Sequence, residues 1–286
     1  MTHTLIDNTP VEEYHEQGIP VLVKREDRCA PKGAPPFSKI RGIMRHLGGL
    51  RDRGVTTVGY TETSISMAGW GVAWACKELG MKAVIFDPQY KDPLKLLQHH
   101  RRQWRKYNAG IEPIQAGMAR VNWNISKRLL AQRYGPDAVL LPLGLPFEES
   151  IEATAQEMVR TLAHLKFTDP LSVVVNVGSG TIAAGVWKGL EQSPLPGAVV
   201  YGIMGRTGDA RRKLTLIARK AKVFPDGIFS PKTQFTIVDP GWEYTDKSTA
   251  PCPFPCHPYY DRKAWQWLTE NISNVPHPIL FWNIGR

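Results

Sequence analysis

The chain has 286 residues and a formal net charge of +10, and 42% of its residues are hydrophobic, so it can bury a sizeable core in one or two domains. No apolar run approaches the roughly 20 residues that cross a bilayer, the first 18 residues are too polar for a secretory signal, and four scattered cysteines are too few for a disulfide framework. These features exclude a membrane protein and a disulfide-stabilised secreted domain, and we expect a reduced, cytoplasmic protein without a membrane partner.

Short β-branched runs alternate with helical stretches along the chain, which indicates the α/β class with mostly parallel sheets. Strands are predicted at 21–23, 57–60, 83–86, 138–141, 173–177, 199–203 and 279–282. Helices are predicted at 39–52, 68–79, 93–107, 123–134, 147–165, 182–192, 211–221 and 261–270. Gly80 is placed to end the second helix, and four prolines within 250–258 predict an irregular loop there.

The first motif with chemical meaning is a lysine at the start of the first predicted helix. The apolar run 21–23 turns abruptly charged at Lys24-Arg25-Glu26-Asp27, and Phe37-Ser38-Lys39-Ile40-Arg41-Gly42 follows. Burial lowers the pKa of a lysine, and a neutral amine can form an imine with an aldehyde. On spacing alone, a solvated lysine explains Lys39 as well.

A second motif follows the strand predicted at 173–177. Gly178-Ser179-Gly180-Thr181 joins that strand to a helix, and the backbone N–H groups of such a loop, with the helix N-terminus, can hold a phosphate. Glycine allows both the turn and the close approach of an anion. A plain strand–helix turn with a capping Ser or Thr is the alternative. The loop lacks the third glycine of a dinucleotide site and the lysine of a P-loop.

Together these motifs resemble the fold-type II pyridoxal-phosphate enzymes, among them threonine dehydratase, cysteine synthase, aminocyclopropane-carboxylate deaminase and D-cysteine desulfhydrase. Two more segments match in the family's order: 71–80 resembles its G-V-A-Y-A-A-K-x-L-G helix, and 257–264 resembles the D-P-V-Y-x-G-K-A segment of the deaminase branch. The resemblance implies two three-layer α/β domains, a large one of residues 1–43 and 144–286 and a small inserted one of 44–143. It also implies a homodimer.

The resemblance gives the matched residues roles around pyridoxal 5'-phosphate. Lys39 would form the Schiff base and then carry a proton, the loop 178–181 would hold the phosphate, and Asp261 would lie at the ring nitrogen. The implied cofactor contacts are Lys39, Asn176, Gly178, Ser179, Gly180, Thr181, Asp261 and Asn283. The implied catalytic residues are Lys39, Ser66 and Tyr260, and those facing the substrate are Ser64, Ser66 and Tyr260.

The chain departs from the family pattern at two places. Met67 stands where the family has an asparagine beside the phenolic oxygen of the cofactor, and Asn283-Ile284 replaces a His-Thr pair near the end. The missing threonine puts more weight on Asp261, since a carboxylate at the ring nitrogen keeps it protonated and strengthens the ring as an electron sink.

Simpler structural explanations remain for some of these residues. Ser64, Ser66 and Asp261 could each cap a helix. The segment Cys252 to His257 has metal-like spacing, but a closed zinc site needs four ligands and no second pair lies nearby, so no metal site is predicted.

The excess positive charge lies in two segments. Residues 91–106 contain six Lys or Arg and one acid, and residues 206–222 contain seven and one. Such clusters attract polyanions and release counterions when they bind phosphates, but a solvated helix face explains them equally well. If DNA binds here, Trp104 could stack on a base. The candidate contacts are Arg101, Arg102, Trp104, Arg105, Lys106, Arg211, Arg212 and Lys213.

Charge and resemblance together lead to a functional hypothesis. Similar enzymes occur in bacteriophage pathways that decorate thymine with amino acids, so we expect a pyridoxal-phosphate-dependent lyase that acts on an amino-acid group carried by DNA, by decarboxylation, in the host cytoplasm. The alternative is elimination, deamination or desulfhydration of a free small amino acid. A nucleic-acid-binding protein with a degenerate fold is disfavoured, because Lys39 and the phosphate loop are both retained.

Overall fold

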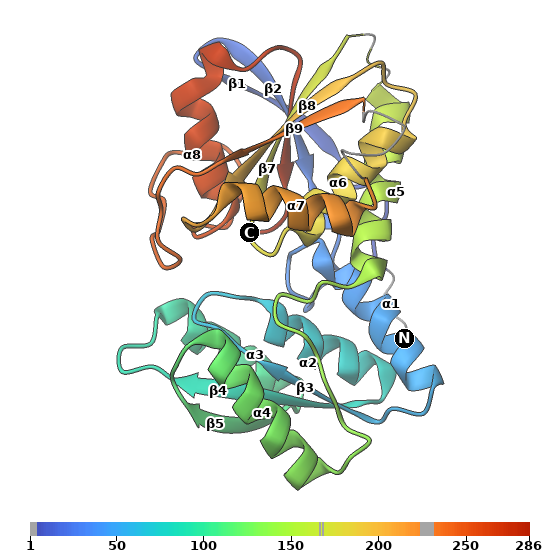
Figure 1. Cartoon of the computed structure of the whole chain (residues 1–286), viewed down its shortest axis with the longest axis vertical. Helices are drawn as coiled ribbons and strands as arrows, with labels where there is room; N and C mark the ends of the chain where they lie inside the picture. Colours follow the sequence, from blue (N-terminus) through green and yellow to red (C-terminus); the bar gives the residue numbers. More distant parts are fainter. Residues whose placement is uncertain (1–4, 166, 168, 224–231) are drawn as a thin grey trace. The chain divides into compact units, whose positions relative to one another are not determined.

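The computed structural model describes residues 5–165, 167, 169–223 and 232–286, and the chain forms two compact units (Figure 1). The large unit consists of Leu5–Ala30, Pro36–Lys39 and Glu148–Arg286, and the small unit contains Pro31–Pro35 and Ile40–Phe147. Parts of the predicted large domain, namely residues 1–4, 166, 168 and 224–231, lie outside the described residues.

The large unit is built on a six-stranded sheet with the order β1-β2-β10-β7-β8-β9. β1 and β2 are antiparallel, and the other neighbouring pairs are parallel. A parallel sheet needs both faces covered, which its apolar central strands reflect. The strands are β1 (Val11–Glu16), β2 (Ile19–Arg25), β7 (Leu171–Val177), β8 (Ala198–Met204), β9 (Thr233–Val238) and β10 (Ile279–Asn283).

Helices cover both faces of this sheet. From β7 the chain steps outward through α6 and β8 to α7 and β9, and it returns through α8 to β10. Because crossovers between parallel strands are right-handed, the reversal places α8 on the face opposite α6 and α7. The helices are α5 (Glu148–Leu165), α6 (Thr181–Gln192), α7 (Ala210–Ala221) and α8 (Asp261–Asn271), with short 3-10 turns η1 (Glu26–Arg28) and η2 (Ile272–Asn274).

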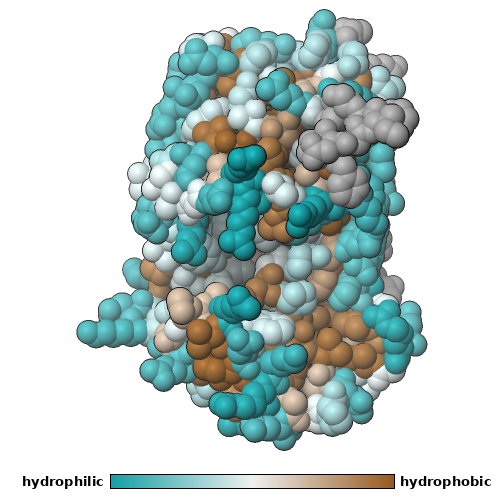
Figure 2. Space-filling view, viewed as in Figure 1, coloured by the Kyte–Doolittle hydropathy of each residue, from teal (hydrophilic) through white to brown (hydrophobic). Residues whose placement is uncertain are grey.

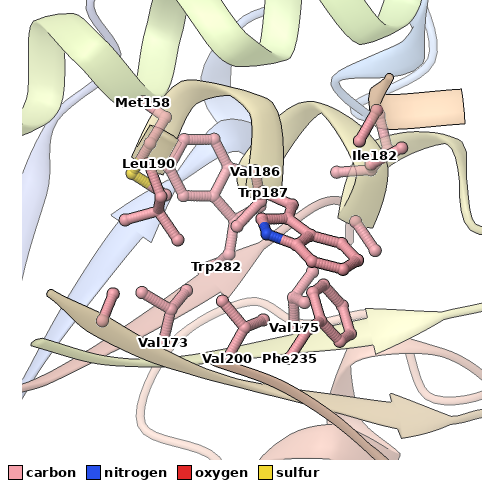
Figure 3. Close-up of a cluster of buried hydrophobic side chains, with 14 of the residues drawn as sticks. Met158, Val173, Val175, Ile182, Val186, Trp187, Leu190, Val200, Phe235 and Trp282 are labelled. Atoms are coloured by element: carbon pink, nitrogen blue, oxygen red, sulfur yellow. The ribbon is translucent and has the colours of Figure 1, made fainter. Parts of the chain in front are cut away.

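Alternate residues of β7 divide between two cores. Val173 and Val175 pack with Trp187 of α6, whereas Val174 packs with Trp265 of α8. Figure 3 shows the first cluster, in which the Trp187 ring lies against Phe235 of β9 with ring centroids 4.9 Å apart. Successive strand side chains point to opposite faces, so one continuous valine run serves both layers.

The helices α5 and α6 pack closely because two residues of α6 have no side chain. A Cβ on Gly185 would lie 2.5 Å from the Cβ of Thr154, and a Cβ on Gly189 would lie 2.6 Å from the carbonyl oxygen of Ala155. Neither position has room for a larger residue, since Cβ atoms do not approach other atoms so closely.

The strand order reverses between β10 and β7. β7 leads outward to β8, whereas β10 returns beside β2. In an open parallel sheet, ligands bind outside the carboxyl ends of the strands at such a reversal. Val177 ends β7 and Asn283 ends β10, so the residues that follow these strands are the candidates for a site.

The small unit has a four-stranded parallel sheet in the order β5-β4-β3-β6. β3, β4 and β5 follow one another through α2 and α3, and α4 carries the chain back to β6, so the right-handed rule places α4 on the other face. The elements are α1 (Lys39–Asp52), β3 (Thr57–Thr61), α2 (Ala68–Leu79), β4 (Lys82–Gln89), α3 (Lys95–Lys106), β5 (Gly110–Gln115), α4 (Ala119–Tyr134) and β6 (Val139–Leu140).

The predicted α/β class with mostly parallel sheets is confirmed, and every predicted helix and strand is present. Gly80 ends α2 with a φ of 70°, as predicted. Three strands carry no sequence pattern that predicts them, β1, β5 and β9, and each of them lies at an edge of its sheet. An edge strand is half solvated and carries polar residues, so it shows no apolar run.

The described residues contain no helix that is long and apolar enough to span a membrane. On the face drawn in Figure 2, hydrophilic residues alternate with smaller hydrophobic areas. Large hydrophobic side chains that are exposed in the described part of the chain are Ile6, Met118, Val121 and Leu216.

Candidate active site

Lys39 is held at the carboxyl end of the large sheet by the residue before it and by its own side chain. The Ser38 N–H donates to the carbonyl oxygen of Ile284, just beyond β10, at 3.0 Å. The Lys39 ammonium donates to Ser179 Oγ at 3.1 Å. Burial, together with the charge of Lys220, lowers the pKa of Lys39 to about 8. Near neutral pH a useful fraction of this amine is therefore unprotonated and nucleophilic.

The loop 178–181 lies directly after β7 and opens the helix α6. Gly180 is the N-cap residue, with a φ of 78° and no capping side chain, so the first N–H groups of α6 have no partner within the helix. A Cβ on Gly178 would meet nothing within 4 Å, which shows open space over the loop. The hydroxyls of Ser179 and Thr181 lie 3.1 Å apart on the same turn. N–H groups, hydroxyls and open space together fit a phosphate.

Two lysines of α7 hold this loop by hydrogen bonds to its carbonyl oxygens. The Lys220 ammonium donates to the carbonyl oxygen of Ser179 at 2.5 Å, and that of Lys213 donates to the carbonyl oxygen of Gly178 at 2.9 Å. Burial, with the charge of Lys213, lowers the pKa of Lys220 to about 8. No ion pair among the described residues involves either lysine. Their charges are therefore available to an anion bound on the loop.

Asp261 is the first residue of α8 and is buried. Its Oδ1 accepts the N–H of Ile284 and its Oδ2 accepts that of Gly285, both at 3.2 Å. Burial raises the pKa of Asp261 to about 8, and the nearby charge of Asp27 adds to the effect. The carboxyl group is thus not used to cap α8, whose N-cap residue is Tyr260. It is free to hold or share a proton with a ring nitrogen.

Tyr260 lies next to Asp261 and is fixed through its backbone. The Asn176 amide donates to the carbonyl oxygen of Tyr260 at 3.0 Å, so Asn176 of β7 joins this segment to the sheet. The Tyr260 hydroxyl lies 3.0 Å from that of Tyr244. Sequence reasoning missed Tyr244, because it lies in an irregular segment that carries no periodic signal and no matched motif. Direct cofactor or substrate contact by Asn176 and Tyr260 stays a prediction.

The charged segment Lys24 to Asp27 connects parts of the large unit through ion pairs and hydrogen bonds. Lys24 and Glu157 of α5 form a fully buried ion pair at 2.7 Å. Arg25 donates two hydrogen bonds to Asp27, at 2.9 and 3.0 Å. The buried Asn283 amide also donates to Asp27, at 3.0 Å. The segment therefore ties β2 to α5 and to β10, and a cofactor contact by Asn283 stays a prediction.

Ser64 and Ser66 belong to the small unit, in the loop before α2. The Ser66 hydroxyl accepts the N–H of Ala68, the first residue of α2, at 3.0 Å. In the same loop the buried Glu62 accepts the N–H of Gly69 at 2.7 Å, and burial raises its pKa to about 8. No signal in the sequence marked Glu62 for burial, since it lies between polar residues. Substrate contacts by the two serines stay predictions.

The structure corrects one of the predicted nucleic-acid contacts. Trp104 is fully buried, so the prediction that it stacks on a base is wrong. The residues Leu97, His100 and Trp104 follow helical spacing and form the inward face of α3. Arg101 is paired with the buried Asp87 at 2.8 Å, which neutralises its charge. The exposed cations among the predicted contacts are Arg102, Arg105, Lys106, Arg211 and Arg212.

Comparisons with known proteins agree with this geometry. Residues 3–224 match the family described as pyridoxal-phosphate dependent enzyme. The chain is 39% identical over 294 residues, covering 99% of the chain and 100% of the relative, to the glycyl-dTMP PLP-dependent decarboxylase of Pseudomonas phage M6.

Solved structures share the fold at low identity. A homologue of ACC deaminase has a TM-score of 0.73 and 18% identity, with 99% of this chain and 91% of that chain covered. Maize serine racemase has a TM-score of 0.65 and 18% identity, with 97% and 89% covered. A hydrogen sulfide-producing enzyme of Fusobacterium nucleatum has a TM-score of 0.67 and 15% identity, with 98% and 94% covered. The chain therefore belongs to the pyridoxal-phosphate dependent enzymes, with the fold of their fold-type II members and pyridoxal phosphate as its cofactor.

Proposed function

We propose that this chain decarboxylates an amino-acid group attached to a thymine nucleotide. The observation that carries the proposal is the 39% identity, over the whole length of both chains, to a phage decarboxylase named for glycyl-dTMP. The residues of the large unit support it, because Lys39, the loop 178–181 and Asp261 lie around the carboxyl ends of neighbouring strands.

The roles of the residues follow from their contacts. Bound pyridoxal phosphate supplies an aldehyde for amines and a ring that withdraws electrons from the α-carbon. The N-terminus of α6 and the loop 178–181 would bind its phosphate, and Asp261 would hold the proton at the ring nitrogen. Lys39, with a pKa lowered to about 8, delivers a proton to the α-carbon after the bond to the carboxylate breaks and CO₂ leaves.

The proposal extends to the surroundings of the reaction. The amino-acid group is carried by DNA, and the exposed cations Arg102, Arg105 and Lys106 of α3 and Arg211 of α7 contact its backbone. Since the relative is a phage protein, the reaction takes place in the cytoplasm of an infected bacterium, with the enzyme as a homodimer.

A decarboxylation assay on the purified protein loaded with pyridoxal phosphate tests the reaction. Glycyl-dTMP and DNA carrying the same base should lose CO₂ while the amine nitrogen stays on the product. The Lys39→Ala variant should lose the activity, whereas Lys32→Ala, at an exposed lysine, should keep it.

Two outcomes would contradict the proposal. One is full activity of Lys39→Ala. The other is release of ammonia or hydrogen sulfide from free small amino acids with no CO₂ from the nucleotide, which would identify the elimination or deamination alternative instead.

A further inference from the structure

A cavity of about 410 Å³ lies in the large unit beside the loop 178–181. Gly178, Tyr244 and Tyr260 line it on the side of the candidate active site, and Arg206, Arg212 and Lys213 also line it. Its volume lies within the usual range of small-ligand sites. Of the residues given to the cofactor above, only Gly178 lines it, and Lys39 and Asp261 do not, so its cationic wall has no assigned role.

The cationic wall of the cavity is held in place by its backbone. The segment 205–209 joins β8 to α7, and Thr207 N–H donates to the carbonyl oxygen of Trp242 at 2.6 Å. The Thr207 hydroxyl and the Gly208 N–H both donate to Asp239 Oδ2, at 2.9 and 3.0 Å. The buried Lys263 donates to the carbonyl oxygen of Gly205 at 2.8 Å. The loop that carries Arg206 is therefore ordered before any ligand arrives.

Within the described part of the chain, the positive charges in this wall, on Arg206, Arg212 and Lys213, form no ion pair with a carboxylate. One carboxylate, Asp209, also lines the cavity, and it accepts the N–H of Arg212 at the start of α7, so the three cations still outnumber it. Burial and the charge of Arg206 lower the pKa of Lys213. Three cations that repel one another around a cavity favour the binding of an anion.

Resting on the proposed function, we propose that this cavity binds the phosphate of the nucleotide that carries the amino-acid group. Arginine offers a planar fork of donors that matches phosphate oxygens, and two arginines with a lysine provide both charge and geometry. The two tyrosines line the same cavity, and Tyr260 directly precedes Asp261 in the chain, so the thymine and its amino-acid group would lie against them. The cavity would thus select a nucleotide over a free amino acid.

Steady-state kinetics with matched substrates tests the site. The three substrates are glycyl-thymidine without phosphate, its 5'-monophosphate, and an oligonucleotide that carries the same base. Arg206→Gln/Arg212→Gln should lower kcat/KM for the monophosphate about 10- to 100-fold, mainly through KM, and leave the unphosphorylated nucleoside unchanged. Arg219→Gln, at an exposed cation of the same helix outside this cavity, should change neither.

The substrate that the double variant affects shows which kind of phosphate the cavity binds. A loss for the monophosphate identifies a terminal phosphate, and a loss confined to the oligonucleotide identifies a phosphodiester; both support the site. Equal kcat/KM for nucleoside and nucleotide in the wild type would overturn it. So would a double variant that fails to take up pyridoxal phosphate, followed by its absorption band, because the cavity would then serve the cofactor.

Direct binding separates this proposal from the proposed function. If no substrate loses CO₂, calorimetry with dTMP still tests the cavity. Binding that Arg206→Gln/Arg212→Gln weakens about 10-fold or more supports it. No binding of either dTMP or the oligonucleotide, measured in the same way, or equal binding of both by wild type and variant, overturns it.

Discussion

Asp261 and Glu62 show how burial changes what a carboxyl group does. Each accepts two backbone N–H groups, yet burial still raises each pKa to about 8. Lys39 undergoes the opposite change for the same reason, because burial disfavours the charged form of any group. The sequence context offered this behaviour for Lys39 but not for Asp261 or Glu62, since their buried environment comes from segments far away in the chain.

These raised pKa values predict how stability depends on pH. In the folded state Asp261 titrates near 8, against an ordinary value of 3.8, so between these values the folded protein binds a proton that the unfolded chain does not. The free energy of unfolding of the cofactor-free protein should therefore fall as the pH rises from about 5 to about 8. Glu62 acts in the same direction.

Urea unfolding across this pH range measures the effect. Asp261→Asn should reduce the slope of the free energy of unfolding against pH by the equivalent of up to about one bound proton. Asp52→Asn, at an exposed position of α1, should leave the slope unchanged. A slope that is the same in all three proteins would show that Asp261 is ionised in the folded state near neutral pH.

At the scale of elements, the large sheet is joined to its helices by buried charge and by close packing. Glu157 of α5 pairs with Lys24 of β2 and accepts the N–H groups of Asn8 and Thr9 at 2.9 and 2.7 Å. Burial opposes its charge, but the Lys24 ammonium, the Arg160 side chain and the N–H of Asn8 lower the pKa of Glu157 to about 2. The pair matters most when one partner is removed, because the other charge stays buried.

A double-mutant cycle tests this pair. Glu157→Gln should cost about 3–5 kcal/mol in the free energy of unfolding, since it leaves the Lys24 ammonium buried without a countercharge. Lys24→Met combined with Glu157→Gln should recover part of that loss. If the losses of the two single variants simply add in the double variant, the pair is not coupled.

The contact between α5 and α6 predicts a second stability effect. Gly185→Ala places a Cβ 2.7 Å from the carbonyl oxygen of Ile151, so the helices must separate, at a cost of about 1–3 kcal/mol. Gly48→Ala in α1 meets nothing within 4 Å and should be neutral or stabilising by up to about 1 kcal/mol. Thermal unfolding of both variants measures the difference in stability. Equal unfolding midpoints would mean that α5 and α6 can move apart at little cost.

The elements that the sequence analysis missed share a physical cause. β1, β5 and β9 are edge strands, and β1 reads Val-Glu-Glu-Tyr-His-Glu, without an apolar run. Pairing with the neighbouring strand stabilises such a segment, so its own residues need not carry a strand pattern. The central strands, buried on both faces, were recognised because burial itself demands β-branched apolar residues.

At the scale of the molecule, the fold decides which of the cations behind the net charge of +10 are paired and which stay exposed. Arg101 is neutralised by Asp87, and Lys213 donates to the loop carbonyl of Gly178 but keeps its charge, while Arg102, Arg105 and Lys106 stay exposed on α3. If these three contact DNA phosphates, affinity should fall steeply with salt, because counterions are released on binding.

Salt titrations of DNA affinity measure that contribution. Replacing Arg102, Arg105 and Lys106 together by glutamine should reduce the slope of log affinity against log salt by roughly 2–3. Lys127→Gln/Arg128→Gln, at exposed cations of α4, serves as the control and should leave the slope nearly unchanged. An unaltered slope in the α3 variant would remove this helix from the DNA-binding surface.

The sequence by itself determined the α/β class, the enzyme family, the cofactor and the order of the central elements, because these depend on local signals: apolar runs, glycines at turns, and short motifs such as Ser38-Lys39 and Gly178 to Thr181. Only the tertiary structure decided which charges are buried, paired or exposed. Trp104 is buried although it lies in the basic segment 91–106. Lys213 lies in the other basic segment, 206–222, and donates to the phosphate loop at Gly178. Burial and electrostatic neighbours arise from residues brought together across the chain, and no local pattern records them.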